Sequence, residues 1–544
     1  MSPSTSRLRF ALALAALSPL PLSAQEHDHP HGGEFGTLGR VTFPVSCAPA
    51  AKPRFEHALA ALHSFWWQAG DSAFGAVLAV DSTCAMAYWG LALNAWGNPF
   101  AGGPVGPDLE KGARAAEHGA RLTAGTPRER GFVAAAAALY RDAERTSNAA
   151  RLQSYADTMA RVYRDFPGEP EVAIYYALSL LATAPRTDTT FAQQRKAIGI
   201  LEPLFARYPD HPGLAHYVIH ATDSPALASL GLSAARRYAR IAPAAPHAQH
   251  MPSHIFVRLG LWDETVASNW QSYRAGMAFV RATGRSRTGP EELHALDYAV
   301  YGYLQRGQDS AARAAVDVAA RVPASDPRPL IGLYNGTALR ARIPLERSDW
   351  AAAAAFPLPD PGTAPVTAAL ARFTRAVGAA RSGRPDAARA DVAALDSIAA
   401  RVAAAPDDYW ARVVRIKRDA ATAWIRLAEG DSAGALALAR SAAEEEDGTD
   451  KHPVTPGELL PARELEADML LATGRHAEAR SAYLATLTRE PGRARSIFGA
   501  ARAAELAGDQ AAAAQGYREY LRMMEKGDGG RAELTVARKV SLHH

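Results

Sequence analysis

The sequence lacks the motifs that identify the common enzyme classes. No GxSxG nucleophile motif, Walker phosphate loop, dinucleotide-binding fingerprint or HExxH zinc motif occurs in its 544 residues. Lysine and arginine (60 residues) nearly balance aspartate and glutamate (56 residues), and no basic block or aromatic–basic motif is present. These absences argue against the familiar hydrolases, nucleotide-binding proteins and zinc proteases, and against nucleic acid as a partner.

Long apolar segments are also lacking, except near the start of the chain. Arg7 and Arg9 precede an apolar run at residues 10–22, and Ser23 and Ala24 offer a small-residue cleavage site. The run is too short for a comfortable membrane span, so the pattern predicts a signal peptide over residues 1–24. We therefore expect an exported protein, periplasmic or secreted, without stable membrane insertion.

Cysteine is scarce as well, with only Cys47 and Cys84 in the chain. In an exported protein the default for such a pair is a disulfide, here between the end of the N-terminal arm and the first helical pair. A pair of thiolate ligands is the alternative. Neither cysteine lies in a CxxC or CxxCH motif, which disfavours covalently attached haem.

Residues 25–45 read as a flexible tail rich in histidine and glycine. His27, His29 and His31 stand at alternate positions, and such a tract can bind Cu²⁺, Ni²⁺ or Zn²⁺ loosely. The simpler interpretation is a solvated N-terminus without a site.

What the sequence has in abundance is alanine and helical periodicity, which predict an all-α protein. Short Gly/Asp segments recur between the helical stretches, as expected for repeated antiparallel helix pairs. These segments are residues 69–72, 306–310, 382–388, 429–433, 473–479 and 507–513. The clearest repeat is near the C-terminus, where Gly474 and Gly508 are 34 residues apart. After each glycine an alanine and a tyrosine occupy the same offsets: Ala479 and Tyr483, then Ala513 and Tyr517.

This period and these positions, with Pro491 closing the first unit, resemble the tetratricopeptide repeat (TPR). The resemblance covers residues 462–522 most strongly and implies a superhelix of stacked antiparallel helix pairs. Arg463 and Ile497 depart from it, since the repeat usually has tryptophan there. We expect an N-terminal TPR-like region over residues 46–355 and C-terminal repeats over residues 366–540. Two Pro/Gly-rich passages, residues 357–362 and 447–461, read as loops within one superhelix.

A narrower resemblance rests on the segments HPGLAHYVIHATDSP, APHAQHMPSHIFVRLGLW and ELHALDYAVYGYLQRGQ, with FEHALAALHSFWWQAGDSAF and DSTCAMAYWGLAL before them. Together they look like a group of bacterial TPR-containing proteins, many of them exported. The resemblance covers roughly residues 44–310 and implies a fold but no reaction. The motif residues that it marks in this chain are His63, Cys84, Trp89, His216, His220, His247, His250, His254, His294 and Asp297.

Six of the 17 histidines fall between residues 211 and 262. Pro212 suits the first turn of a helix that Asp210 can cap, and His216 and His220 then share one face of it. Ser224 is the predicted N-cap of the following helix. We expect Pro252 to push Met251 out of the α region, which places His250 before a helix and His254 in its first turn.

A metal site is the enzymatic possibility that this histidine pattern leaves open. The candidate ligands are His216, His220, His247, His250, His254 and His294, with Asp297 three residues after the last. Imidazole-rich sites suit copper, zinc, iron or nickel, and Met251 would add a soft ligand for copper. Alternatively, these histidines cap backbone groups and bridge helices, or contact a peptide or small ligand directly. The aromatic residues Phe65, Trp66, Trp67, Tyr88, Trp89 and Trp96 read more simply as repeat core than as a ligand cage.

Two functional hypotheses follow from the sequence. The first, which it favours, is a non-enzymatic exported scaffold that binds a protein or peptide partner in a concave groove. The second is a metalloprotein with a histidine-lined site in the N-terminal half of the superhelix. No residue is assigned a catalytic role, and the oligomeric state stays open.

Overall fold

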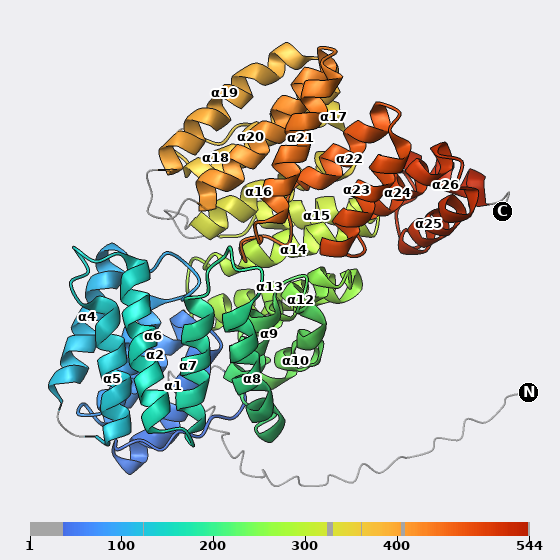
Figure 1. Cartoon of the computed structure of the whole chain (residues 1–544). Helices are drawn as coiled ribbons and strands as arrows, with labels where there is room; N and C mark the ends of the chain where they lie inside the picture. The colour runs from blue at the N-terminus through green and yellow to red at the C-terminus, as the bar shows by residue number, and fades with distance from the viewer. Residues whose placement is uncertain (1–35, 123–124, 324–329, 361, 404–408, 542–544) are drawn as a thin grey trace, which may run out of the picture.

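The regular structure of the chain is helical (Figure 1). The computed structural model describes residues 36–122, 125–323, 330–360, 362–403 and 409–541, and no strand occurs among them. Successive helices pack against each other along the chain in antiparallel pairs, which confirms the predicted all-α, TPR-like superhelix. The predicted signal peptide and His27, His29 and His31 lie outside the described residues.

The N-terminal half of the molecule comprises the helices up to residue 305, together with the short 3₁₀ helix Pro49–Ala51. Its first helices are α1 (Lys52–His63), α2 (Trp67–Val80), α3 (Ala85–Trp96), α4 (Gly106–Arg121), α5 (Pro127–Tyr140), α6 (Asn148–Asp165) and α7 (Pro170–Ala182). They are followed by α8 (Ala192–Arg207), α9 (Pro212–Thr222), α10 (Ala228–Ile241), α11 (Pro246–His250), α12 (Pro252–Arg258), α13 (Trp262–Ala282) and α14 (Glu291–Gln305).

The C-terminal half arches over α13 and α14 in Figure 1. It contains α15 (Asp309–Ala320), α16 (Leu330–Glu346), α17 (Trp350–Ala354), α18 (Pro365–Arg381), α19 (Pro385–Val402) and α20 (Tyr409–Ala428). The chain ends with α21 (Ser432–Asp447), α22 (Ala462–Ala472), α23 (His476–Arg489), α24 (Ala494–Leu506), α25 (Gln510–Met523) and α26 (Ala532–Ser541).

The repeat predicted near the C-terminus is confirmed by α22 to α25. Gly474 has a φ of 78° between α22 and α23, a left-handed conformation that ends the first helix and that glycine adopts without strain. Tyr483 is buried on α23 and packs against Gly499 of α24, where a Cβ atom would lie only 2.4 Å from the tyrosine ring. The small residue therefore lets the two helices approach, and the aromatic ring fills the groove between them.

The predicted break at residues 69–72 is wrong, because this segment lies inside α2. Gly70 serves a close contact instead of a turn. A Cβ atom there would lie 2.2 Å from the Oδ1 atom of Asn94 on α3. The chain turns earlier, at Phe65, which has a φ of 50°.

The N-terminal arm is held against the helices. Leu38, Val41, Phe43 and Val45 are buried in the main core, so residues 36–45 do not form the flexible segment predicted over residues 25–45. A disulfide joins Cys47 to Cys84, and their Cα atoms are 4.9 Å apart. Neither cysteine is therefore a thiolate ligand in this structure.

The loop between α21 and α22, residues 448–461, joins the two halves. The Tyr298 hydroxyl on α14 donates a hydrogen bond to the carbonyl oxygen of Thr455 at 3.1 Å. The Arg342 guanidinium donates to the carbonyl oxygen of Gly457 at 3.0 Å, and Arg258 contacts the Asp450 carboxylate at 2.9 Å. This loop thus contacts α12 and α14 of the N-terminal half and α16 of the C-terminal half.

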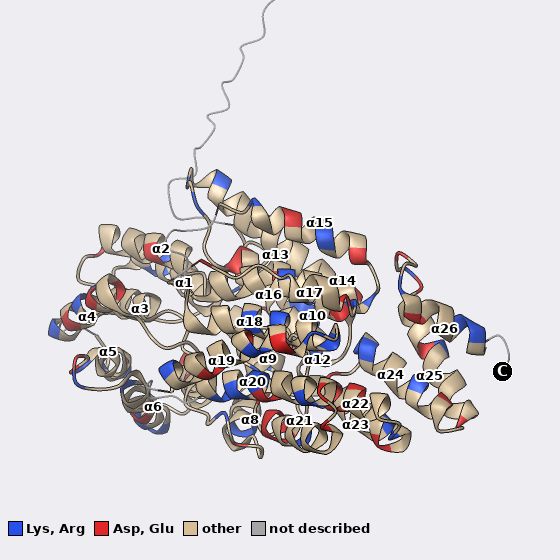
Figure 2. Cartoon of the chain, turned by 90° about the horizontal axis from the view of Figure 1, so that it is seen from above, with Lys and Arg blue, Asp and Glu red and all other residues tan. Residues whose placement is uncertain are grey.

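Charge is distributed evenly along the helices. Figure 2 shows Lys and Arg interspersed with Asp and Glu over the visible elements, α4, α15 and α26 among them. In the part of the chain that the structure describes, no helix has both the length and the apolar character needed to cross a bilayer.

Candidate metal centre

The structure brings together all six histidines that the sequence singled out as candidate ligands. They form two groups, and in each group one potential ligand atom per residue lies within 4.8 Å of the others. The first group is His216, His220 and His247, and the second is His250, His254 and His294. Helices α9, α11, α12 and α14 supply them.

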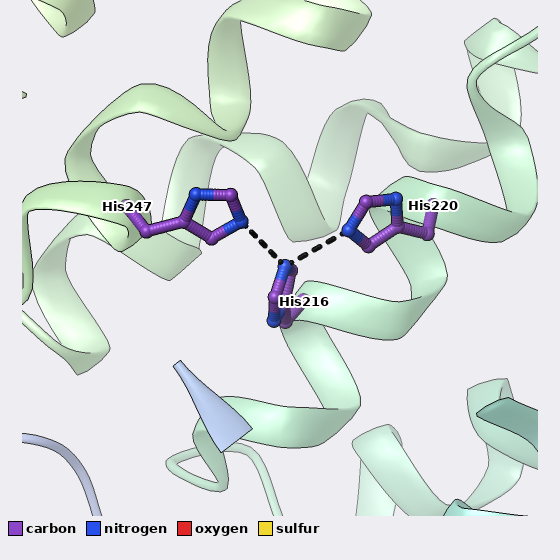
Figure 3. Close-up of side chains that lie close together, drawn as sticks. All are labelled: His216, His220 and His247. Atoms are coloured by element: carbon purple, nitrogen blue, oxygen red, sulfur yellow. Dashed lines mark hydrogen bonds between the residues drawn. The ribbon is translucent and has the colours of Figure 1, made fainter. Parts of the chain in front are cut away.

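The first group converges on His216 (Figure 3). Its Nε2 atom lies 3.0 Å from the Nε2 atom of His220 and 3.2 Å from that of His247. The Nδ1 atom of His216 donates to the backbone carbonyl of His63 at 2.6 Å. Because a carbonyl only accepts, Nδ1 carries the proton, and the Nε2 lone pair of neutral His216 points between the two other rings.

The second group repeats this arrangement. The Nε2 atoms of His250 and His254 are 3.0 Å apart. His250 donates through Nδ1 to the Asn269 Oδ1 atom at 2.6 Å, and the Asn269 amide nitrogen donates to the Thr265 carbonyl, which fixes the amide orientation. His254 donates through Nδ1 to the Asp223 carboxylate at 2.8 Å. When both rings are neutral, two lone pairs face each other, and only a proton or another cation between them relieves the repulsion.

Protonation of these imidazoles, which would remove the repulsion between their lone pairs, is unfavourable in this buried environment. Burial lowers the pKa of His216, His220 and His250 well below the usual value, and neighbouring imidazoles lower it further. Burial also lowers the pKa of His254 despite the opposing charge of Asp223, and it lowers that of His294 to about 3. These five rings are therefore neutral near pH 7, which is the form that binds metal ions.

The two groups adjoin each other. The ring centroids of His247 and His250, three residues apart around α11, are separated by 6.2 Å. Those of His220 and His254 are separated by 6.4 Å. Helix α11 therefore contributes one imidazole to each group, and the six rings form one continuous array.

Carboxylates lie behind the imidazoles. Asp223 contacts His254 and is also paired with Arg258 at 2.9 Å and with Lys451 at 3.7 Å. Burial alone would raise the pKa of Asp223, but these positive charges hold it well below its usual value. Glu291 lies 3.5 Å from the Nδ1 atom of His247. A carboxylate on the Nδ1 side orients the ring and makes its Nε2 atom a stronger ligand.

The third residue of the second group, His294, has a different partner. Its Nδ1 atom lies 3.2 Å from the amide nitrogen of Asn335. Asp297, predicted beside it as part of a metal face, lies elsewhere. Its carboxylate is paired with the buried Arg342 guanidinium at 2.7 Å, because a buried aspartate is most stable opposite an arginine.

A third cluster consists of His63, Glu171 and His211, whose side chains hydrogen-bond one another. Glu171 accepts from the Nε2 atom of His63 at 2.9 Å and from that of His211 at 2.7 Å. The remaining nitrogens contact the Tyr217 hydroxyl and the backbone N–H of Leu214. Every ring nitrogen thus has a partner, and the cluster positions the His63 carbonyl that anchors His216.

Phe65 forms an apolar wall against the first group. Its ring centroid lies 4.5 Å from that of His216, 5.8 Å from that of His220 and 5.5 Å from that of His247. Its positive φ costs on the order of 1–3 kcal/mol for a residue with a side chain, and such strain concentrates at functional sites. Phe65 belongs to the main hydrophobic core, as predicted, and its contact with the three imidazoles was not predicted.

Three local predictions in this region are wrong. His211, rather than Asp210, caps α9 by accepting from the N–H of Leu214. Ser224 does not cap α10, whose N-cap is Leu227.

Met251 stays helical, with φ −52° and ψ −35°, so α11 runs directly into α12. His254 does lie in the first turn of α12, as predicted. Met251 is buried in the main hydrophobic core.

Sequence reasoning also missed the residues that hold the ligands in place. Neither Asp223 nor Asn269 was assigned a role from the sequence. The only signals in the sequence were an acidic residue, Asp223, three positions after His220, and an asparagine, Asn269, inside the stretch that forms α13. Neither points to a particular histidine without the tertiary contacts.

No protein-family model matches the chain, and no curated protein matches it in sequence. Among solved structures, it is similar to yeast Tom70, with 10% identity over 91% of this chain and 96% of that one and a TM-score of 0.32. A structure of Naa15/Naa10 bound to HypK-THB shows 13% identity over 91% of this chain and 73% of that one, with a TM-score of 0.22. The TPR domain of P58(IPK) shows 14% identity over 69% and 98%, with a TM-score of 0.21. Likenesses at this level carry no argument about function.

Proposed function

We propose that this protein is a metalloprotein that binds two transition-metal ions, one at each three-histidine group. The observation that carries the proposal is the pair of facing Nε2 atoms, 3.0 Å apart, of His250 and His254, each with its Nδ1 proton already given to an acceptor. The first group supports it in the same way, through the Nε2 atoms that surround His216.

The chemistry of the histidine side chains limits which metal ions the two groups can bind. Neutral imidazole suits copper, zinc, iron and nickel, whereas magnesium and calcium prefer oxygen ligands. Three protein ligands per ion leave a coordination position open, which is the arrangement of a catalytic rather than a purely structural site.

The test is metal content and affinity of the untagged full-length chain. We expect two ions per chain by elemental analysis after dialysis against copper or zinc. His216→Ala and His250→Ala should each reduce this to about one, because each removes the central ligand of one group. His118→Ala is the control, since His118 is exposed on α4. Retention of two tightly bound ions in the double variant would refute the proposal.

Binding of a protein or peptide partner in a concave groove, the first hypothesis from the sequence, stays a prediction. It does not compete with the metal site, because a superhelix can carry both.

A further inference from the structure

We propose that the Lys451 ammonium group, on the loop of residues 448–461, competes with the metal ion of the second group for Asp223 and is displaced when that ion binds. The second group therefore binds its ion more weakly than the first group does, and filling it frees the part of the loop around Lys451. This inference rests on the proposed metal binding and adds the order of filling and its effect on the loop.

The charges behind the second group already pair with one another. Asp223 accepts a hydrogen bond from His254 at 2.8 Å. The same carboxylate contacts Arg258 at 2.9 Å and Lys451 at 3.7 Å. Arg258 has a further carboxylate partner, Asp450, at 2.9 Å. A metal ion therefore enters the second group against two positive charges that share its nearest carboxylate.

The first group has no such competition. Glu291, whose carboxylate lies 3.5 Å from the Nδ1 atom of His247, forms no ion pair with a lysine or arginine of the described residues. Burial and neighbouring imidazoles lower the pKa of His216 and His220, and no described lysine or arginine is among the main causes. These imidazoles therefore meet a metal ion without an ammonium group beside them.

The charge of Lys451 acts on the second group directly. Burial lowers the pKa of His254 most, and Lys451 lowers it further, while Asp223 opposes both. A positive charge that disfavours a proton on an imidazole also disfavours a metal cation on it, because both are positive. The loop thus supplies a group that weakens metal binding at one group and not at the other.

Of the two cations beside Asp223, Lys451 is the one that is weakly held. Its side chain is only 9% exposed, yet its Nζ atom donates no hydrogen bond to any described residue. Arg258, by contrast, donates to the Asp223 carboxylate at 2.9 Å, to the Asp223 carbonyl at 3.2 Å and to Asp450 at 2.9 Å. A buried ammonium group without a hydrogen bond costs free energy. A metal ion therefore displaces Lys451 and leaves Arg258 in place.

The contacts on either side of Lys451 depend on the surroundings of the second group. Asp450 pairs with Arg258, and the carbonyl oxygen of Pro453 accepts from the Tyr298 hydroxyl at 3.2 Å. The Tyr298 ring lies against the three imidazoles of the second group, with centroid separations of 4.8, 5.2 and 5.1 Å. Displacement of Lys451 therefore loosens residues 450–453.

The other end of the loop is held independently. Arg342 donates to the Thr455 hydroxyl at 2.8 Å and to the Gly457 carbonyl at 3.0 Å. Neither hydrogen bond involves Asp223 or a histidine of the two groups. We therefore expect the change to stay within residues 448–453.

The first experiment measures zinc affinity of the untagged full-length chain in competition with a chelator. We expect two binding steps, of which His216→Ala removes the tighter and His250→Ala the weaker. Lys451→Met keeps the aliphatic stem without the charge, and should tighten the second step by about 5- to 150-fold, the usual range for coupled sites. Lys451→Arg retains the charge and should keep the second step weak.

Lys417→Met is the matched control, because Lys417 is also buried and paired with a carboxylate, Glu458, but contacts neither group. The first step should be the same in all three lysine variants. Equal tightening in Lys417→Met and Lys451→Met, or a weaker second step in Lys451→Met, would overturn the inference.

The second experiment needs no variant that could fail to fold. Hydrogen–deuterium exchange of the wild-type chain should become faster at residues 448–453 with the second equivalent of zinc, and stay unchanged there with the first. Residues 455–461 serve as the internal control and should not respond. Slower exchange at residues 448–453 would mean that the ion and Lys451 stabilise the same loop conformation, which would contradict displacement.

The two proposals fail in different ways. Two ions bound with equal affinity and no change in the loop overturn this inference and leave the metal-binding proposal intact. A chain that retains no metal overturns both.

Discussion

The two halves of the molecule share one architecture but treat their buried polar groups differently. In the C-terminal half, buried charged side chains form ion pairs. Arg493 contacts Glu464 at 2.6 Å, and Arg495 contacts Asp468 at 2.8 Å. In the N-terminal half, buried imidazoles face each other through lone pairs. A helix-pair stack thus tolerates a polar interior where the partners are complementary, and the exception is the place where we propose that an external ion binds.

The His63–Glu171–His211 cluster shows that the local partner, and not the half of the molecule, determines whether a buried histidine is satisfied. It lies in the N-terminal half beside the first group, yet its carboxylate satisfies both rings. Identical side chains thus form a self-satisfied structural cluster in one place and, in the next, the groups that we propose bind metal.

The largest expected effect comes from breaking the closed network of the C-terminal half. Glu464→Gln removes a fully buried carboxylate that Arg493 and Arg495 both contact, and leaves two guanidinium groups short of a partner. We expect the free energy of unfolding to fall by about 3–5 kcal/mol in chemical denaturation, with metal content unchanged. Glu110→Gln, in an exposed pair with Arg114, should change little, and a similar loss there would argue against the role of burial.

The closed histidine cluster should lose stability in acid. Burial alone would raise the pKa of Glu171, but His63 and His211 outweigh it and lower that pKa to about 2 from 4.5. A carboxyl with a depressed pKa contributes stability that is present above pH 4.5 and is lost as the pH falls towards 2. The difference in unfolding free energy between the metal-free protein and Glu171→Gln should shrink by about 3 kcal/mol over this range. A difference that stays constant with pH would contradict this assignment.

A smaller effect should distinguish a carboxylate that orients a histidine of the two groups from one that only forms a buried ion pair. Asp223→Asn weakens the acceptor of the His254 Nδ1 proton. We expect metal affinity to fall by about 10- to 100-fold in competition with a chelator. Asp297→Asn is the matched control, because Asp297 is also buried and paired with an arginine but belongs to neither group. Equal losses of affinity in both variants would show that general destabilisation, not ligand orientation, is responsible.

The smallest effect concerns glycines in the two halves. Gly474→Ala in the C-terminal repeat meets no atom within 4 Å, so only its φ of 78° is strained. It should cost about 1 kcal/mol and leave metal binding unchanged. Gly213→Ala in α9 would place a Cβ atom 2.4 Å from the Nδ1 atom of His63, whose carbonyl anchors His216. That variant should lower metal affinity as well as stability, and an unchanged affinity would separate His63 from the site.

Much of the fold was predictable because its signals are local. The Gly474/Gly508 period, the alanine and tyrosine offsets, and most turns follow from residues that act within one helix pair. Gly70 was misread because its neighbour Asn94 is 24 positions away, and a close helix contact and a turn both select glycine. The Met251 prediction failed because packing of α11 against α13 overrides the local preference before proline.

Stacked helix pairs and six particular histidines as candidate ligands could be predicted from the amino-acid order alone, because helical period and residue chemistry are properties of short segments. Helix packing determines how these histidines divide into two groups and which nitrogen of each anchored ring carries its proton. It also pairs Asp297 with Arg342 instead of with a histidine group. The reason is physical: the ligands come from four helices, and their anchors, such as Asn269 and the His63 carbonyl, reach them only when the helices pack.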